Sequence, residues 1–158
     1  MFTGIVQELG TVERVQRSRT IDRLTIYAPK TAARVAPGES LAINGACLTL
    51  VRAHEGCLLF EVIAQTRRLT NLGAVVAGSR VNVELSLTLS DRLSGHLVLG
   101  HVDGLATVSR WARVAAGEAL EVRVPPALGR YLVPQGPVAL DGVSLTVGAK
   151  PPPARCVV

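Results

Sequence analysis

The sequence predicts an all-β protein, a tandem of two related barrels of which the second is incomplete. Residues 4–12, GIVQELGTV, return as GHVDGLATV at residues 100–108, an offset of 96. Residues 44–50, NGACLTL, return as DGVSLTV at residues 141–147, an offset of 97. Short apolar segments recur at roughly ten-residue spacing between Gly and Pro turns, a pattern typical of small antiparallel barrels. A repeat of this length indicates tandem domains rather than a solenoid.

The first elements of the chain follow from alternation and from proline. Residues 2–15 mix apolar and polar residues, and Val6, Thr11 and Val12 among them favour a strand, while residues 24–27 alternate as a strand does. Residues 31–35 are expected to form a helical turn, since Pro29 and Pro37 limit a helix on both sides.

Three further strands complete the first repeat. Residues 40–51 and 57–64 are expected to form two of them, joined by a Gly-containing turn at residues 53–56. Residues 65–73 are expected to form a polar, arginine-containing turn. Residues 81–89 have the clearest pattern, because Val and Leu alternate with Asn, Glu, Ser and Thr. That alternation predicts a strand with one buried face.

The second repeat follows the same plan. Strands are expected within residues 101–111 and 120–124, and a helical turn within residues 127–132. Pro126 and Pro134 flank this turn, 97 residues after the proline pair of the first repeat. The same order of elements therefore supports two homologous domains.

The duplication places the domain boundary and exposes a deficit. We expect a first barrel at residues 1–96 and a shorter second one at residues 97–158. Counterparts of roughly residues 60–92 are absent from the second repeat. A proline run, residues 151–153, stands where the first repeat has its hairpin turn at residues 53–55.

Composition bounds the setting of the protein. The chain has 158 residues, 48% of them hydrophobic but only 3% aromatic, so the core must consist of Val, Leu, Ile and Ala. No apolar run approaches the ~20 residues that cross a bilayer, and the N-terminus does not resemble a signal peptide. Three cysteines without a CxxC pair are typical of a reduced environment. We therefore expect a cytoplasmic protein without a membrane partner.

The net charge of +5 raises the alternative of a nucleic-acid-binding barrel. The basic residues are almost all arginines and are scattered along the chain. The nearest approach to a patch is Arg14, Arg17, Arg19 and Arg23, which no stacking aromatic residue accompanies. We interpret these arginines as a solvated surface, and no nucleic-acid partner is expected.

Two polar pairs recur at the repeated motifs. Cys47 and Thr49 lie two apart on a strand, and Ser144 and Thr146 lie at the equivalent positions. Such pairs are either ordinary packing or the walls of two equivalent ligand pockets. His101, whose counterpart is Ile5, is a candidate for proton transfer or a structural histidine. Neither a phosphate-binding glycine loop nor a metal-ligand spacing of His and Cys is present, so no cofactor or metal is expected.

Five motifs together resemble riboflavin synthase of the α-subunit type. They are the N-terminal MFTGIV, NGACLT at residues 44–49, TNLG at residues 70–73, GHLVLGHVDG at residues 95–104 and DGVSLTV at residues 141–147. The resemblance covers the whole chain and about three quarters of the family's length. It implies two six-stranded Greek-key lumazine-binding barrels and no cofactor.

The resemblance also implies an activity and partners. The family converts two molecules of 6,7-dimethyl-8-ribityllumazine into riboflavin and 5-amino-6-ribitylaminouracil by moving a four-carbon unit between them. Its sites lie between neighbouring subunits of a homotrimer, and it can associate with lumazine synthase. Holding the two rings face to face supplies much of the catalysis. With a shortened second barrel, we expect this chain alone to be poorly active and not a stable trimer.

The family's site residues transfer to matching positions of this sequence. His101, Cys47 and Ser144 are the candidate catalytic residues. The first pocket is expected to contain Gly4, Ile5, Val6, Cys47, Leu48, Thr49, Glu61, Val62, Ile63, Ala64, Gln65 and Thr66. The second is expected to contain Gly100, His101, Val102, Ser144, Leu145 and Thr146, with Gln135 as a further substrate-binding position.

Some positions depart from the family pattern and keep a second hypothesis open. Gln65-Thr66-Arg67 replaces Glu-Thr-Leu, and Gln135 replaces a ligand-facing lysine. Glu84-Leu85-Ser86 replaces Glu-Arg-Ala, and Ser94-Gly95-His96 replaces Gly-Gly-His. The intact motif around His101 favours an enzyme. Gln135 and the short second repeat favour a lumazine- or flavin-binding protein without catalysis.

Overall fold

A computed structural model describes residues 1–114, 117–148 and 155–158. The chain divides into two compact units. The first unit consists of residues 1–102 and 139–143, and the second consists of residues 103–138 and 144–158. No helix in the described part of the chain is long and apolar enough to cross a membrane.

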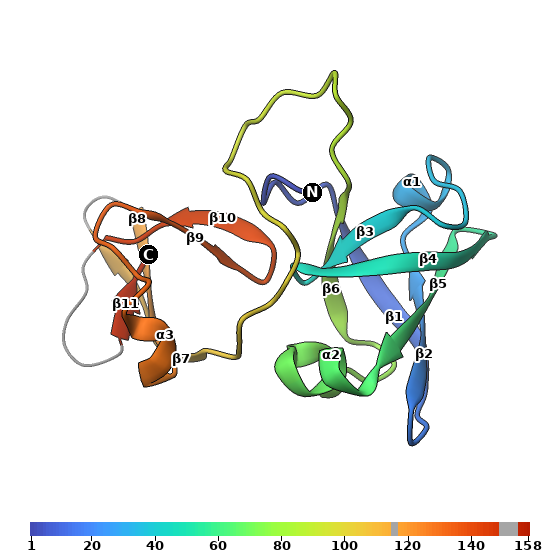
Figure 1. The fold of residues 1–158 in the computed structure, drawn as a ribbon, viewed down its shortest axis with the longest axis horizontal. Helices are drawn as coiled ribbons and strands as arrows, with labels where there is room; N and C mark the ends of the chain where they lie inside the picture. The colour runs from blue at the N-terminus through green and yellow to red at the C-terminus, as the bar shows by residue number, and fades with distance from the viewer. Residues whose placement is uncertain (115–116, 149–154) are drawn as a thin grey trace. The chain divides into compact units, whose positions relative to one another are not determined.

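The first unit is a closed antiparallel barrel of six strands (Figure 1). Around the barrel the order is β1-β2-β5-β4-β3-β6, so β6 returns past β5 and β4 to pair with β3 and β1, as in a Greek key. This confirms the predicted all-β barrel fold. The strands are β1 Glu8–Gln16, β2 Ile21–Tyr27, β3 Ser40–Ile43, β4 Ala46–His54, β5 Cys57–Ile63 and β6 Arg80–Leu85.

Alternating apolar residues fill the barrel. Leu24 and Ile26 of β2, Leu50 of β4 and Phe60 of β5 are buried, and their polar neighbours along each strand face outward. Two short helical segments and a 3-10 turn connect the strands: α1 Pro29–Ala32, α2 Ala64–Leu69 and η1 Asn71–Gly73. A helical turn was predicted at residues 31–35, and α1 begins two residues earlier, whereas α2 lies where only a polar turn was expected.

The predicted single strand at residues 40–51 is wrong, because the chain reverses at Asn44-Gly45. Asn44 has a φ of 46° and Gly45 a φ of 80°. Positive φ at both central residues is the geometry of a two-residue hairpin, for which Asn-Gly is the preferred sequence. β3 and β4 therefore pair antiparallel, with Ile43 opposite Ala46. Asp141-Gly142 of the second repeat has the same geometry, with φ of 48° and 77°.

The strand predicted at residues 81–89 ends early, and one polar residue on it is buried. β6 ends at Leu85, and Leu89 is fully exposed. Glu84 was expected on the polar face, yet it is only 3% exposed. Its Oε1 accepts hydrogen bonds from the Thr3 N–H (2.7 Å) and hydroxyl (2.8 Å), and its Oε2 accepts one from the Gly4 N–H (3.1 Å). The N-terminal segment therefore covers Glu84.

The second repeat forms two partial sheets, and the hairpin among them includes residues 139–143, which group with the first unit. β7 Thr107–Val114, β8 Gly117–Arg123 and β11 Arg155–Val157 form one sheet, in the order β11-β8-β7. β9 Pro137–Leu140 and β10 Val143–Thr146 form a hairpin. α3 Pro126–Gly129 lies at the predicted helical turn. The first strand begins at Thr107, later than expected, and the proline run at residues 151–153 lies outside the described residues.

The burial of Glu84 generates a prediction for stability. Glu84→Gln replaces one acceptor oxygen with an amide donor that faces N–H and O–H donors of Thr3 and Gly4. The loss is expected to lower the free energy of unfolding by about 1–3 kcal/mol, the cost of leaving buried groups unpaired. Urea unfolding measures the difference. Glu39→Gln, at an exposed glutamate, is the control. Equal effects of the two substitutions would contradict the assigned role of Glu84.

Candidate functional site

The first unit has an opening where two neighbouring strands of the barrel part. β4 pairs with β5 from His54 opposite Cys57 to Leu50 opposite Phe60. The register shifts between Leu50 and Arg52, and no residue of β4 before Leu50 pairs with β5. The start of β4 continues its pairing with β3, and the end of β5 continues its pairing with β2. We call residues 46–49 and 61–63, the two strand ends that do not pair with each other, the β4–β5 opening.

Backbone groups point into this opening from both strands. Leu50 N–H bonds to the Glu39 carbonyl on the β3 side, and Ala64 N–H bonds to the Thr20 carbonyl on the β2 side. Because backbone directions alternate along a strand, the N–H and C=O groups of Thr49, Glu61 and Ile63 face the opening. A ring with donors and acceptors along one edge can bond to such groups.

The outward side chains around the opening are those that the sequence singled out. Cys47 and Thr49 lie on the outer face of β4, while Leu48 between them is buried. Glu61 and Ile63 lie on the outer face of β5, with Val62 buried. Ala64 and Thr66 of α2 are half-buried, and Gln65 is exposed. The structure thus brings residues 47–49 and 61–66 to one place, although Leu48 and Val62 contribute only backbone.

Gly100 forms the next part of this wall. Cys47 N–H donates to the Gly100 carbonyl at 2.8 Å, and Phe2 pairs with Val98 just before it. Gly100 has a φ of 80°, and a Cβ there would lie 2.6 Å from Cys47 Cβ and 2.9 Å from Phe2 Cε2. The sequence placed Gly100, His101 and Val102 in the second pocket. In the structure Gly100 packs on the first barrel, His101 is exposed and Val102 packs on the core, and the assignment of these residues to the second pocket stays a prediction.

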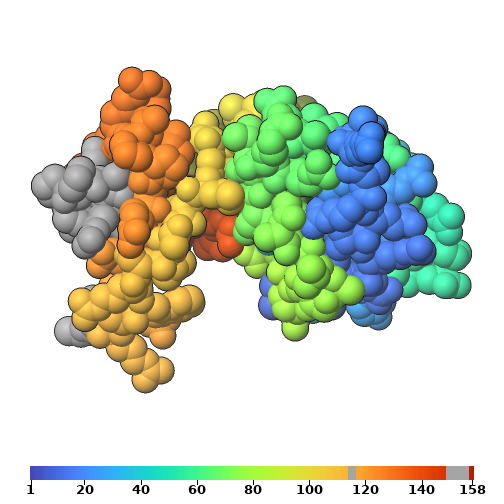
Figure 2. Space-filling model, turned by 90° about the horizontal axis from the view of Figure 1, so that it is seen from below, coloured from blue at the N-terminus to red at the C-terminus, as the bar shows by residue number. Residues whose placement is uncertain are grey.

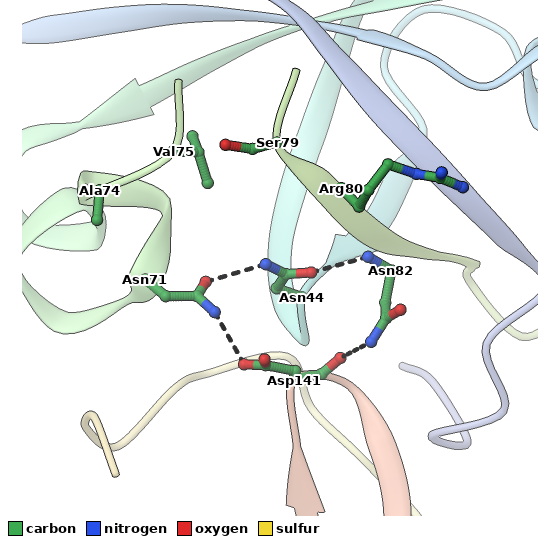
Figure 3. A pocket seen from close by; sticks show the side chains of 8 residues that line it. All are labelled: Asn44, Asn71, Ala74, Val75, Ser79, Arg80, Asn82 and Asp141. Carbon is green, nitrogen blue, oxygen red and sulfur yellow. Dashed lines mark hydrogen bonds between the residues drawn. The ribbon is translucent and has the colours of Figure 1, made fainter. Parts of the chain in front are cut away.

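The α2–η1 segment, residues 64–73, spans the opening from β5 toward β4. It leaves the end of β5, and its Asn71 reaches the β3–β4 turn, where Asn44 Nδ2 donates to Asn71 Oδ1 at 3.1 Å. Asn71 Nδ2 donates in turn to Asp141 Oδ1 at 2.9 Å, and Asn82 bonds both Asn44 and Asp141 (Figure 3). These residues line an open cavity of about 480 Å³. In Figure 2 the segment is green, on the surface of the unit.

A buried carboxylate lies beneath the same segment. Asp22 of β2 is 1% exposed and accepts hydrogen bonds from Arg17, Arg67 and the Ser18 N–H. Burial by itself raises the pKa of Asp22, but these hydrogen bonds and the two guanidinium charges lower its pKa below the usual value. The carboxylate is therefore ionised at neutral pH. Arg17, interpreted from sequence as part of a solvated surface, is instead an ion-pair partner.

The remaining candidate residues lie elsewhere. Ile5 lines a second cavity of about 520 Å³ whose lining includes Glu84 but none of Cys47, Thr49 and Gly100. Gly4 is buried and Val6 half-buried. In the second repeat, Ser144 and Leu145 are half-buried on β10 and Thr146 is exposed. Gln135 is exposed in a turn with a φ of 63°. Among the described residues, no cluster of His, Cys, Asp and Glu is arranged to hold a metal ion.

The packing of Gly100 generates a prediction with an internal control. Gly100→Ala adds a methyl group that meets Cys47 and Phe2, in a backbone conformation that alanine also disfavours. Gly78→Ala imposes the same backbone penalty at a φ of 88°, with no atom within 4 Å of the new Cβ. We expect Gly100→Ala to cost about 1–3 kcal/mol more than Gly78→Ala in the free energy of unfolding. Equal costs in urea unfolding would show that residue 100 is not held against β4.

Comparison with known proteins places the chain in a family. The family model of the lumazine binding domain matches residues 3–86 and 99–155. Riboflavin synthase of Mycobacterium tuberculosis is 40% identical over 148 residues, which are 93% of this chain and 74% of that protein. Riboflavin synthase of Bacillus subtilis is 36% identical over 147 residues, 93% of this chain and 68% of that protein.

Solved structures share the fold. The crystal structure of LumP complexed with riboflavin superposes with a TM-score of 0.91, covering 100% of this chain and 85% of that one at 23% identity. LumP complexed with 6,7-dimethyl-8-(1'-D-ribityl) lumazine gives a TM-score of 0.87. The two-segment match and these sequence relatives show that the chain belongs to the riboflavin synthase family of lumazine-binding-domain proteins.

Proposed function

We propose that this chain binds 6,7-dimethyl-8-ribityllumazine in the β4–β5 opening and acts as a riboflavin synthase. The observation that carries the proposal is the parting of β4 from β5, with Cys47 and Thr49 on one side and Glu61 and Ile63 on the other. The pyrimidinedione edge of a lumazine alternates donors and acceptors, which complements backbone groups that face each other across the opening. The relatives named riboflavin synthase support the reaction.

The reaction joins two identical substrates, and the duplicated chain suits that requirement. One lumazine donates a four-carbon unit and the other accepts it, yielding riboflavin and 5-amino-6-ribitylaminouracil. Ser144 and Thr146 repeat Cys47 and Thr49 on a second strand, and they are the proposed contacts of the second lumazine. Close placement of the two rings is expected to supply much of the rate enhancement.

His101 is the proposed proton-transfer residue. It follows Gly100, whose carbonyl is bonded to Cys47, so its backbone is anchored beside the opening while its side chain is exposed. A lumazine methyl group must lose a proton before it attacks the second ring, and an imidazole is suited to accept that proton near neutral pH. The expectation that this chain alone forms no stable homotrimer, the association with lumazine synthase and the domain division at residue 96 also remain predictions.

A second candidate function is lumazine or flavin binding without catalysis. Its support is the likeness to LumP, whose crystal structures contain riboflavin or a ribityllumazine. Both functions share the binding step and differ in turnover. Incubation with 6,7-dimethyl-8-ribityllumazine separates them, because only the synthase releases 5-amino-6-ribitylaminouracil.

Binding is tested by a fluorescence titration with 6,7-dimethyl-8-ribityllumazine and with riboflavin. We expect saturable binding by the wild-type chain and its loss in Thr49→Trp, because the indole occupies the opening. Thr25→Trp, on the outer face of β2 where its pairing with β5 is continuous, is the control and is expected to bind normally. No saturation by the wild type, or equal losses in both variants, would contradict the proposed site.

Turnover is tested by comparing substitutions at His101 and Cys47. His101→Ala is expected to slow riboflavin formation about 10²–10⁴-fold, the usual contribution of a general base. Cys47→Ser is expected to be tolerated, since serine is the natural residue at the equivalent position 144. Steady-state rates with matched thermal stabilities measure the contrast. Equal losses from the two substitutions would show that His101 has no special role.

A further inference from the structure

We propose that Asp22, with Arg67 and Arg17, is the positioning group of the ligand opening, because it holds the α2–η1 segment across the gap. This inference rests on the proposed function, since it assigns residues that set the wall of that same site. None of the three belongs to the candidate residues transferred from the family motifs.

The Asp22 carboxylate holds one arginine with each oxygen. Arg67 Nη1 lies 2.8 Å from Oδ1 and also donates to the Ser18 carbonyl at 2.9 Å. Arg17 Nη1 lies 2.6 Å from Oδ2. The backbone of Asp22 pairs with Val62 in the β2–β5 ladder, and the Ser18 N–H donates to Oδ1 of the carboxylate at 2.9 Å. A single buried anion on a barrel strand thus anchors two cations.

The two arginines hold the α2–η1 segment near its two ends. Arg67 is part of α2 itself. The other guanidinium nitrogen of Arg17, Nη2, donates to the carbonyls of Gly73 (2.9 Å) and Val75 (2.8 Å), just beyond η1. Between these points, the Thr70 hydroxyl donates to the Thr66 carbonyl at 2.7 Å and links α2 to η1. The carboxylate is therefore linked through the two arginines to both ends of the segment.

The segment needs this support. α2 has six residues and no side-chain N-cap hydrogen bond, and a helix of that length is unstable by itself in water. Apart from the Asp22 cluster, the α2–η1 segment is tied to the barrel by the Ala64 N–H bond to the Thr20 carbonyl and, at the opposite side of the opening, by Asn71, which bonds Asn44 and Asp141. Removing the Arg67 contact therefore frees the half of the segment that carries Gln65 and Thr66, the residues proposed to face the ligand.

Arg67→Gln is the most informative substitution, because it leaves the Arg17–Asp22 pair in place and no buried charge without a partner. Local opening of α2 reduces the population that can bind, so the dissociation constant is expected to rise about tenfold. Because one nitrogen of Arg67 makes both contacts, Arg67→Lys can supply an equivalent donor and is expected to restore binding. Arg17 uses two nitrogens, so Arg17→Lys is not expected to restore what Arg17→Gln loses.

Two measurements test the inference. Fluorescence titration with 6,7-dimethyl-8-ribityllumazine gives the dissociation constants, and hydrogen–deuterium exchange of the unliganded protein gives local opening. Arg68→Gln removes the same charge from the same helix at an exposed side chain and is the control. We expect Arg67→Gln alone of these two to weaken binding and to speed exchange in residues 64–73, with exchange in β1 to β6 unchanged.

The outcomes separate the inference from the function on which it rests. If the wild type binds the lumazine and Arg67→Gln binds equally well, the positioning role is overturned while the proposed function stands. Faster exchange throughout the barrel in Arg67→Gln also overturns it, because the cluster would then support the fold in general. If the wild type shows no saturable binding, the proposed function fails and the inference with it.

Discussion

A closed barrel of six antiparallel strands pairs each strand with two neighbours, and in the first unit that pairing is interrupted between the start of β4 and the end of β5. Each strand keeps its other neighbour, so the barrel stays closed while backbone groups face one another across a gap. Buried or enclosed backbone groups need partners. The Cys47 N–H bonds to the Gly100 carbonyl, and the edge of a ligand can bond to the backbone groups of Thr49, Glu61 and Ile63.

The surrounding segments are arranged with respect to this gap. The chain around Gly100 lies along β4, where only glycine fits between Cys47 and Phe2. On the other side, the α2–η1 segment crosses from β5 to the turn at Asn44. Asp22 lies below that segment, and Glu84 fixes the N-terminal segment that carries Phe2. Buried acidic groups thus add polar contacts to two segments that each also bury one large apolar side chain, Phe2 in the N-terminal segment and Leu72 in η1.

Periodicity and duplication were enough to predict the barrel, because its strands alternate and its turns repeat at a fixed offset. They were not enough for the exact strands. The Asn44-Gly45 turn is a strong hairpin signal that a continuous β-rich run concealed, and the strand at residue 81 ends where its polar residue Glu84 is captured by the N-terminus. α2 contains good helix formers, but at six residues it is too short for its sequence pattern to be told from a polar turn.

The residues around Cys47 could be proposed from the repeat and the family resemblance, whereas the position of Gly100 and the role of Asp22 could not. In the repeat, Gly100 is the counterpart of Gly4, and it was therefore assigned to the second pocket. In the structure its carbonyl bonds Cys47 of the first barrel, which the repeat does not indicate. One signal for Asp22 was present. It shares the inward parity of Leu24 and Ile26 on a strand, and an aspartate at such a position requires cationic partners.

The central claim is that the ligand lies where β4 and β5 part, and the most direct measurement of it is a backbone NMR titration. Amide chemical shifts of the wild-type chain are followed as 6,7-dimethyl-8-ribityllumazine is added. The account predicts the largest shifts at Thr49, Ile63 and Gly100. Shifts concentrated around Ile5 and Leu87, in the cavity beside Glu84, with those three amides unchanged, would contradict it.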